Sequence, residues 1–384
     1  MRVLHVHSGN IYGGIETMLV QLTRSRHLCP EMETQYALCF EGRFSEELES
    51  VGARVYSLGK VRLRKPSSIF KSRRALKRLL AEERFDVIIC HSAWSIVAFG
   101  PTVRSVGLPL VFWLHATTDG KHWLERWARR TQPALVICNS EFTAAKRDLL
   151  YPNTQSELIY CPVAAPELNY TNDDRQTVRA ELNTPDGAVA IIQISRLEKY
   201  KGHGVLLEAL SMLRDSEDWV YWQVGGPQTT EEFRYLDELK AMAGRLGIAE
   251  RVRFLGWQPD ALRLLAASDI YCQPNTVAEP FGITFIESLY ARRPIVTTDL
   301  GGPKEILDES CGILVPPGDR SALAAVLRRL IKDSELRAQM GEAGPIRAKQ
   351  LCDPAAQIQQ LYRTLSGLSE NGYREKLNQG FNPA

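Results

Sequence analysis

The regular alternation of short apolar segments with longer amphipathic segments constrains the fold of this chain more than any other feature. The apolar segments are rich in β-branched residues, which is typical of parallel strands buried on both faces. The sequence predicts strands at residues 2–8, 34–40, 54–58, 86–91, 109–115, 134–140 and 157–163, and again at 188–195, 219–224, 252–255, 270–273, 294–298 and 312–315. Because helical segments separate most of these strands, we predict an α/β protein with doubly wound parallel sheets.

Two such sheets are expected, because the alternation stops once and then restarts. Residues 164–172 (AAPELNYTN) contain a proline, polar side chains and no periodicity, so we interpret them as a linker. We predict two Rossmann-like domains, residues 1–165 and 166–352, followed by a C-terminal helix and tail, residues 353–384. Such domains bind ligands beyond the carboxyl ends of their strands, so a site is expected in the cleft between the two domains if they face each other.

The charge of the chain is nearly balanced in total but not along its length. It has 47 Lys and Arg against 45 Asp and Glu, which argues against a generic nucleic-acid binder. The first 165 residues hold 22 basic and 15 acidic side chains, and nine basic residues with no acidic ones lie between Lys60 and Arg78. Two interpretations stay open: a solvated helix face, or contact with an anionic membrane surface or a phosphate-bearing lipid acceptor.

The sequence predicts a cytoplasmic protein, either free or peripheral at the inner face of the membrane. The first residues lack the continuous apolar core of a signal peptide, and the longest uncharged stretch, residues 87–103, is too short to span a bilayer. None of the eight cysteines forms a CxxC pair, so reduced core thiols are expected. No HExxH or similar motif occurs, and no metal site is expected.

Three junctions between strands and helices carry residues suited to binding an anion or a sugar. The first is SGNIYGGIE, in which Gly13 and Gly14 precede a predicted helix. Glycine lets a ligand approach the backbone, and N–H groups at a helix start favour an anion. Taken alone, this segment is typical of a tight turn. It is not a GxGxxG motif, which argues against a dinucleotide site.

The second junction is SRLEKYKG, at the end of the first strand of the second domain. Arg196 and Lys201 place two cations on one loop, and Gly202 opens the next helix, an arrangement that suits a diphosphate. The alternative is that both are ordinary solvated charges. Two GGP turns, residues 225–227 and 301–303, are expected at the same rim of the domain.

The third junction is EPFGITFIE, where a proline and a glycine predict a helix that begins near Phe281. Glu279 would then be a loop carboxylate just before the helix, and Glu287 would lie about a turn and a half into it. Two such carboxylates can accept hydrogen bonds from vicinal sugar hydroxyls. The backbone N–H groups at the helix start, which would face a ligand, belong to Phe281, Gly282 and Ile283. The alternative is a plain helix start with one exposed glutamate.

A histidine also closes a predicted strand of the first domain. His115, in WLHATTDG, leads into a polar loop, and both a role in the cleft and a structural role stay open. His5, His7 and His91 lie near other strand ends, and we interpret them as mainly structural.

The motifs SRLEKYKG, EPFGITFIE and LGGPKEIL, in this order and spacing, together with YGGIE near the N-terminus, resemble the retaining GT-B glycosyltransferases of family 4. The resemblance covers nearly the whole chain, and its specific signal lies in the second domain. It implies a GT-B fold with C-terminal helices that cross back to the first domain. It also implies a metal-independent, cofactor-free transfer of a sugar from a UDP-, GDP- or ADP-sugar to a saccharide or glycolipid hydroxyl, with retention of anomeric configuration.

The resemblance further implies roles for the site residues of the second domain. Arg196 and Lys201 would bind the donor diphosphate and stabilise the leaving group, Glu287 would hold the ribose hydroxyls, and Glu279 would lie near the donor sugar. The backbone groups that would contact the sugar or phosphate belong to Phe281, Gly282 and Ile283. From the first domain, Gly13 and Gly14 would close onto the diphosphate and His115 would lie near the transferred sugar.

Other functions remain as alternatives at this point. A nucleotide-sugar epimerase or hydrolase could share the fold, although such proteins do not resemble this chain in the SRLEKYKG and EPFGITFIE motifs. A non-catalytic nucleotide- or sugar-binding module would not need all four of Arg196, Lys201, Glu279 and Glu287. A nicotinamide dehydrogenase lacks support because its glycine motif is missing.

Overall fold

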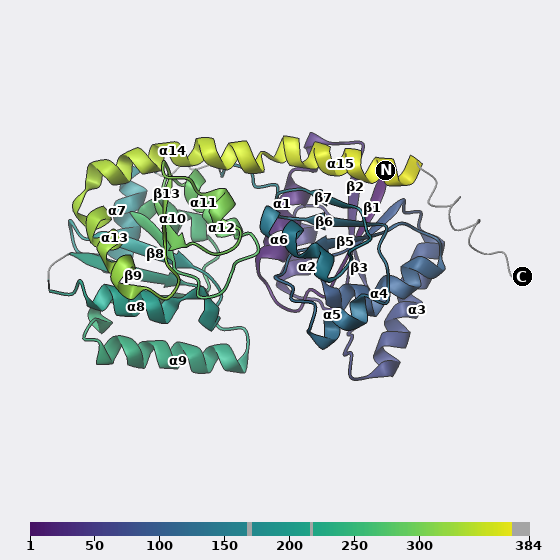
Figure 1. The fold of residues 1–384 in the computed structure, drawn as a ribbon, viewed down its shortest axis with the longest axis horizontal. Coiled ribbons are helices and arrows are strands. Elements are labelled where there is room, and N and C mark those ends of the chain that lie inside the picture. The colour runs from purple at the N-terminus through teal and green to yellow at the C-terminus, as the bar shows by residue number, and fades with distance from the viewer. Residues whose placement is uncertain (167–170, 216–217, 371–384) are drawn as a thin grey trace, which may run out of the picture. The chain divides into compact units, whose positions relative to one another are not determined.

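The computed structural model describes residues 1–166, 171–215 and 218–370. The predicted tail, residues 371–384, and residues 167–170 of the predicted linker lie outside the described residues. The chain forms two compact units: Met1–Ala164 together with the chain from Cys352 onward, and Ala165–Leu351. Each unit is built around one parallel sheet (Figure 1). The predicted fold class, two Rossmann-like parallel-sheet domains, is therefore confirmed.

The described residues of the first unit contain a seven-stranded sheet in the order β3-β2-β1-β4-β5-β6-β7, with every neighbouring pair parallel. Its strands are β1 (Arg2–His7), β2 (Glu33–Leu38), β3 (Val55–Ser57), β4 (Val87–Cys90), β5 (Leu110–Leu114), β6 (Leu135–Cys138) and β7 (Ser156–Leu158). Its helices are α1 (Gly14–Arg24), η1 (Arg26–Leu28), α2 (Arg43–Ser50), α3 (Pro66–Glu82), α4 (Ala93–Ser105), α5 (Trp123–Ala128), α6 (Glu141–Lys146), η2 (Arg147–Leu149) and α15 (Pro354–Glu370).

In the described part of the second unit, six parallel strands follow the order β10-β9-β8-β11-β12-β13. The strands are β8 (Val189–Ile194), β9 (Trp219–Val224), β10 (Val252–Gly256), β11 (Ile270–Gln273), β12 (Ile295–Thr298) and β13 (Gly312–Val315). The helices are α7 (Asn172–Glu181), η3 (Lys199–Lys201), α8 (His203–Ser211), α9 (Thr230–Arg245), η4 (Ala249–Arg251), α10 (Ala261–Ala267), α11 (Ile283–Tyr290), α12 (Pro303–Ile306), α13 (Arg320–Lys332) and α14 (Ser334–Cys352).

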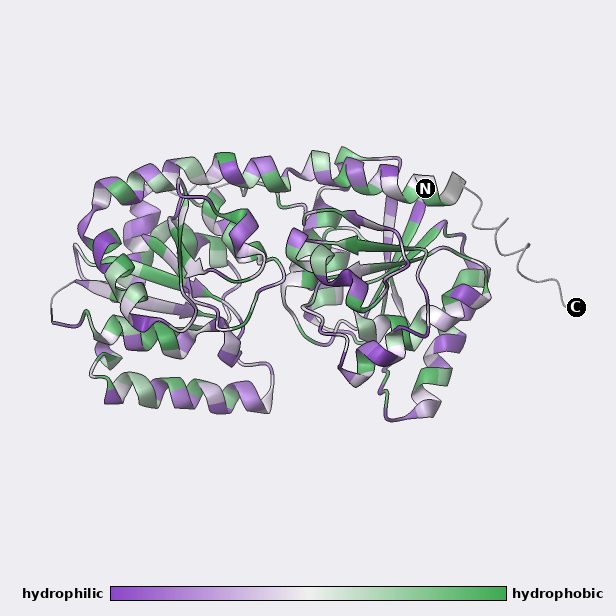
Figure 2. Cartoon of the chain, in the orientation of Figure 1, coloured by the Kyte–Doolittle hydropathy of each residue, from purple (hydrophilic) through white to green (hydrophobic). Residues whose placement is uncertain are grey.

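The strands form because their side chains are apolar on both faces. Every residue of β4, β5, β6, β9 and β11 is buried, and Figure 2 shows the strands of both sheets mainly in the hydrophobic colour. Helices cover both faces of such a sheet, because a parallel sheet needs apolar contacts on each side. Each unit has its own core of buried side chains from strands and helices.

One helix was missed by the sequence prediction. The segment that follows the predicted linker forms α7, although only Val178 of this helix is buried. Instead of an apolar stripe, two arginines hold the helix: Arg175 and Arg179 lie 2.7 and 3.1 Å from the carboxylate oxygens of Asp269. Burial alone would raise the pKa of Asp269, but the charge of Arg175 keeps this pKa below its ordinary value. Tertiary ion pairs of this kind leave no periodic apolar signal in the sequence.

The last strand of the first sheet is shorter than predicted. Residues 157–163 were expected to form one strand, but β7 ends at Leu158. The backbone N–H of Val163 instead donates to the carbonyl of Cys352, at the end of α14. A proline at residue 162, which has no N–H to donate, lies in this stretch.

The final helix, α15, packs on the first unit. Its Ile358, Leu361 and Leu365 are buried, and the side chains of Gln359 and Gln360 donate to carbonyls of the first unit, those of Leu28 and Leu158. The first unit is therefore assembled from both ends of the chain.

Two further features concern the cysteines and the length of the apolar helices. All eight cysteines lie within the described residues and are buried. No helix in the described part of the chain is long and apolar enough to cross a membrane.

Candidate active site

The order of the second sheet places its functional loops side by side. From β8 the chain proceeds outward in one direction through β9 and β10, and then in the other direction through β11, β12 and β13. The loops that follow the neighbouring strands β8 and β11 therefore start side by side at the carboxyl edge of the sheet, which is where doubly wound folds bind ligands. These two loops carry SRLEKYKG and EPFG.

An ion pair joins these loops. The Nζ atom of Lys201 lies 2.5 Å from Oε2 of Glu279, and both side chains are nearly buried. The side-chain amide of Asn275 donates to the same carboxylate oxygen at 3.5 Å. An ammonium group has three N–H donors, so this pair leaves two of them for oxygen atoms of a ligand. Glu279 thus orients the lysine without using all of its donors.

Close backbone contacts hold the two loops in register. Gly202 has a φ of +78°, and a Cβ atom at this position would lie 1.8 Å from the carbonyl oxygen of Pro274. The N–H of Thr276 donates to the carbonyl of Tyr200 at 2.7 Å, which ties the same loops together. Only glycine combines this φ with such a close approach.

The second GGP turn supports Glu279 from the other side. The N–H of Gly302 donates to the carbonyl of Glu279 at 2.8 Å, and a Cβ atom on Gly301 would lie 2.3 Å from that carbonyl oxygen. The first GGP turn packs in the same way against the SRLEKYKG loop, where a Cβ on Gly225 would lie 2.0 Å from the carbonyl of Ser195. Both turns therefore lie at the same rim, and each fixes a different site loop.

Arg196 is held by two carboxylates. Its Nη2 donates to Oε1 of Glu232 at 2.7 Å, and its Nη1 lies 3.2 Å from Glu198. The other oxygen of Glu232 accepts the N–H groups of Gln228 and Thr229 and so caps the start of α9. The Nε of Arg196 is buried and has no hydrogen-bond partner among the described residues. The helix cap therefore also positions the guanidinium.

The helix of the third motif starts two residues later than predicted. Gly282, with a φ of +99°, precedes the first helical residue, Ile283, and has no side chain that could cap the N–H groups of the first turn. Phe281 is buried beside them. Glu287 is half-buried on the second turn of α11, and its burial raises its pKa to about 7.

In the first unit, the predicted glycines start α1. The N–H of Gly13 donates to Oε2 of Glu16, whose Oε1 lies 2.6 Å from Nε2 of His7. Glu16 is buried, so it satisfies the helix start internally. A Cβ on Gly14 would meet no atom within 4 Å. The backbone at Gly14 therefore borders open space at this helix start.

His115 is the outer member of a chain of three histidines. Its Nε2 lies 3.0 Å from Nδ1 of His91, and Nε2 of His91 lies 2.8 Å from Nδ1 of His5. His5 and His91 are completely buried, whereas His115 is partly exposed. Burial lowers the pKa of His5 and of His115 to about 3 and also lowers that of His91, so all three rings are neutral at pH 7.

The proton positions of the three rings are coupled, because each contact needs one donor and one acceptor. At the buried end of the chain of rings, Nε2 of His5 has no hydrogen-bond partner among the described residues. An orphaned buried N–H is rarer than an orphaned acceptor. The favoured arrangement therefore leaves a lone pair on His5 Nε2. The Nδ1–H of His5 then donates to Nε2 of His91, and the Nδ1–H of His91 donates to Nε2 of His115. The proton of His115 is then on its Nδ1. In this state the Nδ1 of His115 is a hydrogen-bond donor and not a proton acceptor.

Nitrogen-15 NMR of the histidine rings tests this tautomer. We expect neutral His115 to carry its proton on Nδ1 at pH 7, and His91→Phe to populate both tautomers because the acceptor at Nε2 is then no longer fixed. His27→Phe, at an exposed position outside the chain of rings, serves as the control and should leave His115 unchanged. A proton on Nε2 of His115 in the unaltered protein would reverse the assignment.

Two family patterns match most of the chain. The family described as Glycosyl transferases group 1 matches residues 174–347, and the one described as Glycosyltransferase Family 4 matches residues 12–165. The lipopolysaccharide core biosynthesis glycosyltransferase LpsD of Rhizobium meliloti is 30% identical over 350 residues, which cover 90% of this chain and 92% of that protein. The chain belongs to the group 1 glycosyltransferases.

Other relatives of this glycosyltransferase extend the comparison. The human alpha-1,3/1,6-mannosyltransferase ALG2 is 29% identical over 318 residues, 75% of each chain. The Anabaena protein HepE, solved in complex with UDP-glucose, superimposes with a TM-score of 0.85 at 25% identity, over 96% of this chain and all of that one. The predicted family, the GT-B fold and glycosyltransferase activity are thereby confirmed.

The structure adds residues that the sequence-based prediction for this glycosyltransferase did not include. They position the predicted site residues. Glu232, Asn275 and His91 were not singled out for a role in the site. The capping pattern of Thr229 and Glu232 is visible in the sequence, but its bond to Arg196 is not. Asn275 has no sequence signal of its own.

Proposed function

We propose that this glycosyltransferase moves a sugar from a nucleoside-diphosphate sugar to a hydroxyl of a saccharide or glycolipid, with retention of anomeric configuration and without a metal ion. The observation that carries the proposal is the Lys201–Glu279 pair at the carboxyl edge of the second sheet, beside the uncapped start of α11. These groups, with Arg196 on the same loop as Lys201, form a site in which carboxylates hold two cationic donors in fixed positions.

In the proposed chemistry, these cationic donors stabilise the leaving group, the nucleoside diphosphate. As the bond to the anomeric carbon breaks, negative charge grows on the diphosphate, and preorganised donors that meet this charge lower the barrier. Lys201 and Arg196 would supply those donors. The N–H groups at the start of α11 would add to them, because a helix N-terminus favours anions.

Retention is proposed through attack from the face that the diphosphate leaves. A double displacement would need a free carboxylate beneath the sugar. Glu279, the carboxylate proposed to lie near the donor sugar, is already bonded to Lys201 and Asn275. In the proposed step the acceptor oxygen bonds to the anomeric carbon, the bond to the diphosphate oxygen breaks, and the acceptor proton passes to the diphosphate.

A donor assay tests the proposal. UDP-glucose is the first donor to try, because the relative HepE was solved with it, and GDP- and ADP-sugars follow. We expect release of the nucleoside diphosphate, also in the presence of a chelator, and a product with the donor's anomeric configuration by NMR. An inverted product would contradict retention. Sugar isomerisation without an acceptor would favour an epimerase, and binding without any donor cleavage would favour a binding module.

The pH dependence of donor binding tests the proposed role of Glu287 in holding the ribose. Its pKa is about 7 in the folded protein, against an ordinary value of 4.5. The folded state therefore holds the proton more tightly than the unfolded state, so the contribution of Glu287 to folding stability is complete below pH 4.5 and is lost as pH rises through 7. Ribose hydroxyls would donate to the ionised carboxylate, so we expect affinity for an intact nucleotide sugar to rise up to about tenfold between pH 6 and pH 8.

Glu287→Gln is the matched variant for this measurement by calorimetry. It should bind the donor more weakly and show no such rise, because the amide does not titrate. An intact donor is used because its diphosphate diester does not ionise near pH 7. The same pH profile in the variant would remove Glu287 from the proposed ribose site.

A peripheral contact with an anionic membrane at the inner face of the membrane stays a proposal for the segment from Lys60 to Arg78. Basic residues near anionic lipid contribute about 1 kcal/mol each. The exposed basic side chains of α3 are available for such a contact, namely those of Lys71, Arg74, Lys77 and Arg78.

A further inference from the structure

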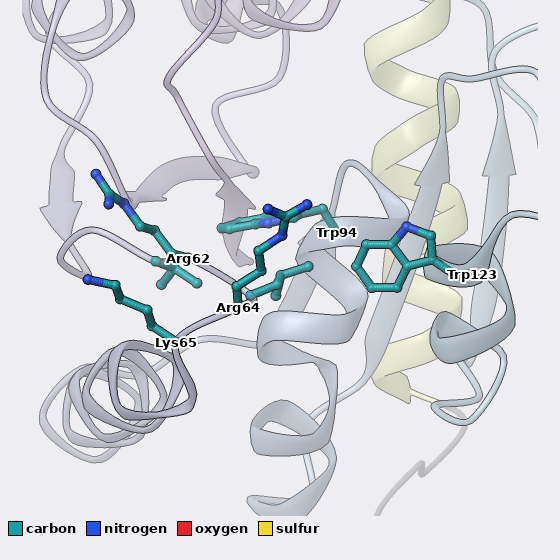
Figure 3. Close-up of a pocket in the computed structure, with 7 residues that line it drawn as sticks. Arg62, Arg64, Lys65, Trp94 and Trp123 are labelled. Carbon is teal, nitrogen blue, oxygen red and sulfur yellow. The ribbon is translucent and has the colours of Figure 1, made fainter.

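A pocket lies at the carboxyl edge of the first sheet, outside the site described above. Its volume is about 490 Å³, within the usual range for small-ligand pockets. The loop after β3 and the first turns of α4 and α5, the helices that follow β4 and β5, form it, so it shares this edge with His115, which directly follows β5. The lining residues, shown in Figure 3, are Val61, Arg62, Leu63, Arg64, Lys65, Trp94 and Trp123.

The loop that carries the basic residues of the pocket is well anchored. Val61 is buried in the core of the first unit. The hydroxyl of Ser68 accepts the N–H of Arg62 and bonds to the carbonyls of Arg62 and Lys65, which closes the loop against the start of α3. The side chains on this loop therefore start from fixed backbone positions.

The basic residues between Lys60 and Arg78 do not all have the same surroundings. The guanidinium of Arg73 donates to the carbonyls of Ala98 and Val97 in α4. Pro101 has no N–H for the carbonyl of Val97, so Arg73 replaces a missing helical hydrogen bond. Arg73 is thus structural, and it is not available to a ligand.

Arg64 has a different environment. It is exposed, and no ion pair within the described residues involves it. In Figure 3 the side chain of Arg64 extends toward Trp94, whereas Arg62 and Lys65 extend away from Trp123. A planar guanidinium with free donors binds phosphate oxygens in a bidentate manner.

The two tryptophans give the pocket an apolar wall. Trp94 is partly buried and packs edge-on against Phe99 at 6.1 Å between ring centroids. Trp123 is 56% exposed, which is unusual for so large an apolar side chain, and it rests against Trp127 at 6.3 Å. An exposed indole face that is supported from behind suits the apolar face of a sugar ring.

We propose that this pocket binds a phosphorylated sugar unit of the acceptor, with Arg64 on the phosphate and the sugar ring against Trp123. The inference rests on the proposed function, because it places the acceptor of that reaction. A pocket whose lining combines the guanidinium of Arg64 with two indoles matches a compact sugar phosphate better than a broad lipid surface. The exposed cations of α3 are the alternative place for lipid.

Binding is measured by calorimetry with glucose 6-phosphate as the probe, against glucose alone and inorganic phosphate alone. We expect the sugar phosphate to bind at least tenfold more tightly than either part, since it makes both the hydrogen-bonded charged contact of the phosphate and the apolar contact of the ring. Arg64→Ala should weaken binding about tenfold or more on the same basis, and Trp123→Ala several-fold. Arg74→Ala, which removes one exposed charge from the same segment, is the matched control and should have no effect.

Two other arms separate the explanations. In a co-sedimentation assay, vesicles of phosphatidylglycerol replace the sugar phosphate. If Arg64→Ala loses vesicle binding but keeps its sugar-phosphate binding, the proposal is overturned in favour of a lipid surface. Equal loss in Arg64→Ala and Arg74→Ala would also overturn it, because only net charge would matter. Binding of UDP, GDP and ADP is measured separately. A protein that binds one of these nucleotides but no sugar phosphate contradicts this inference alone, whereas failure to bind any of the three contradicts the proposed donor site.

Discussion

Replacing Lys201 with alanine is expected to lower kcat by about 100- to 1,000-fold, the usual cost of losing a preorganised donor to a developing negative charge. The effect should fall on kcat more than on KM, because the diphosphate gains charge as the sugar departs. Arg196→Ala should act in the same direction. Steady-state kinetics with the donor identified above provide the measurement.

Lys199→Ala is the control for this experiment. Lys199 belongs to the same short helix as Lys201, but its side chain is 69% exposed and pairs with Glu238 at the surface. It should retain near-normal kcat. Circular dichroism must show that Lys201→Ala is folded, because this change leaves Glu279 nearly buried without its ion-pair partner. Turnover close to normal in both Lys201→Ala and Arg196→Ala would mean that the reaction does not depend on these cations.

Gly202→Ala is expected to destabilise the second unit by about 3 kcal/mol or more, near the upper end of single substitutions. A left-handed backbone costs a non-glycine residue about 1–2 kcal/mol. The remainder comes from the new Cβ, which would lie 1.8 Å from the carbonyl oxygen of Pro274. This contact can be relieved only if the two site loops separate, so activity should fall as well.

Gly187→Ala isolates the backbone contribution to this effect. Gly187 has a φ of +79°, against +78° at Gly202, but a Cβ there would meet nothing within 4 Å. We expect it to cost only about 1–2 kcal/mol in the free energy of unfolding and to leave activity unchanged. Denaturant unfolding followed by circular dichroism compares the two. Equal losses of stability would show that close packing of the site loops contributes little.

The sequence predicts the place of the site better than its internal contacts. Strand alternation and the glycines put Arg196, Lys201 and Glu279 at strand ends, and the structure has them there. The contact between Lys201 and Glu279 depends on β8 lying beside β11, a neighbour relation between segments about 80 residues apart that no local pattern contains.

The same limit explains the histidines. His5, His91 and His115 each lie in or just after a strand, which the sequence shows, but β1, β4 and β5 must be adjacent for the rings to meet. Helix α7 was not predicted because its stability also depends on a tertiary contact: its arginines pair with Asp269, and it has no apolar face that the sequence could show. Local propensity and periodicity report burial within one element, and not the partners that it finds.

The position of α15 has a consequence for how the protein is made. The second unit is one continuous stretch, Ala165–Leu351, whereas the first unit needs the chain from Cys352 onward to complete it. During synthesis on a ribosome, the second unit can therefore finish folding before the first, although the first begins to emerge earlier. Until α15 is released, the surface that Leu361 and Leu365 later cover stays open. Nascent chains stalled before residue 354 should thus be bound by chaperones through the exposed surface of the first unit. The first unit, although synthesised first, is completed only when α15 packs on it.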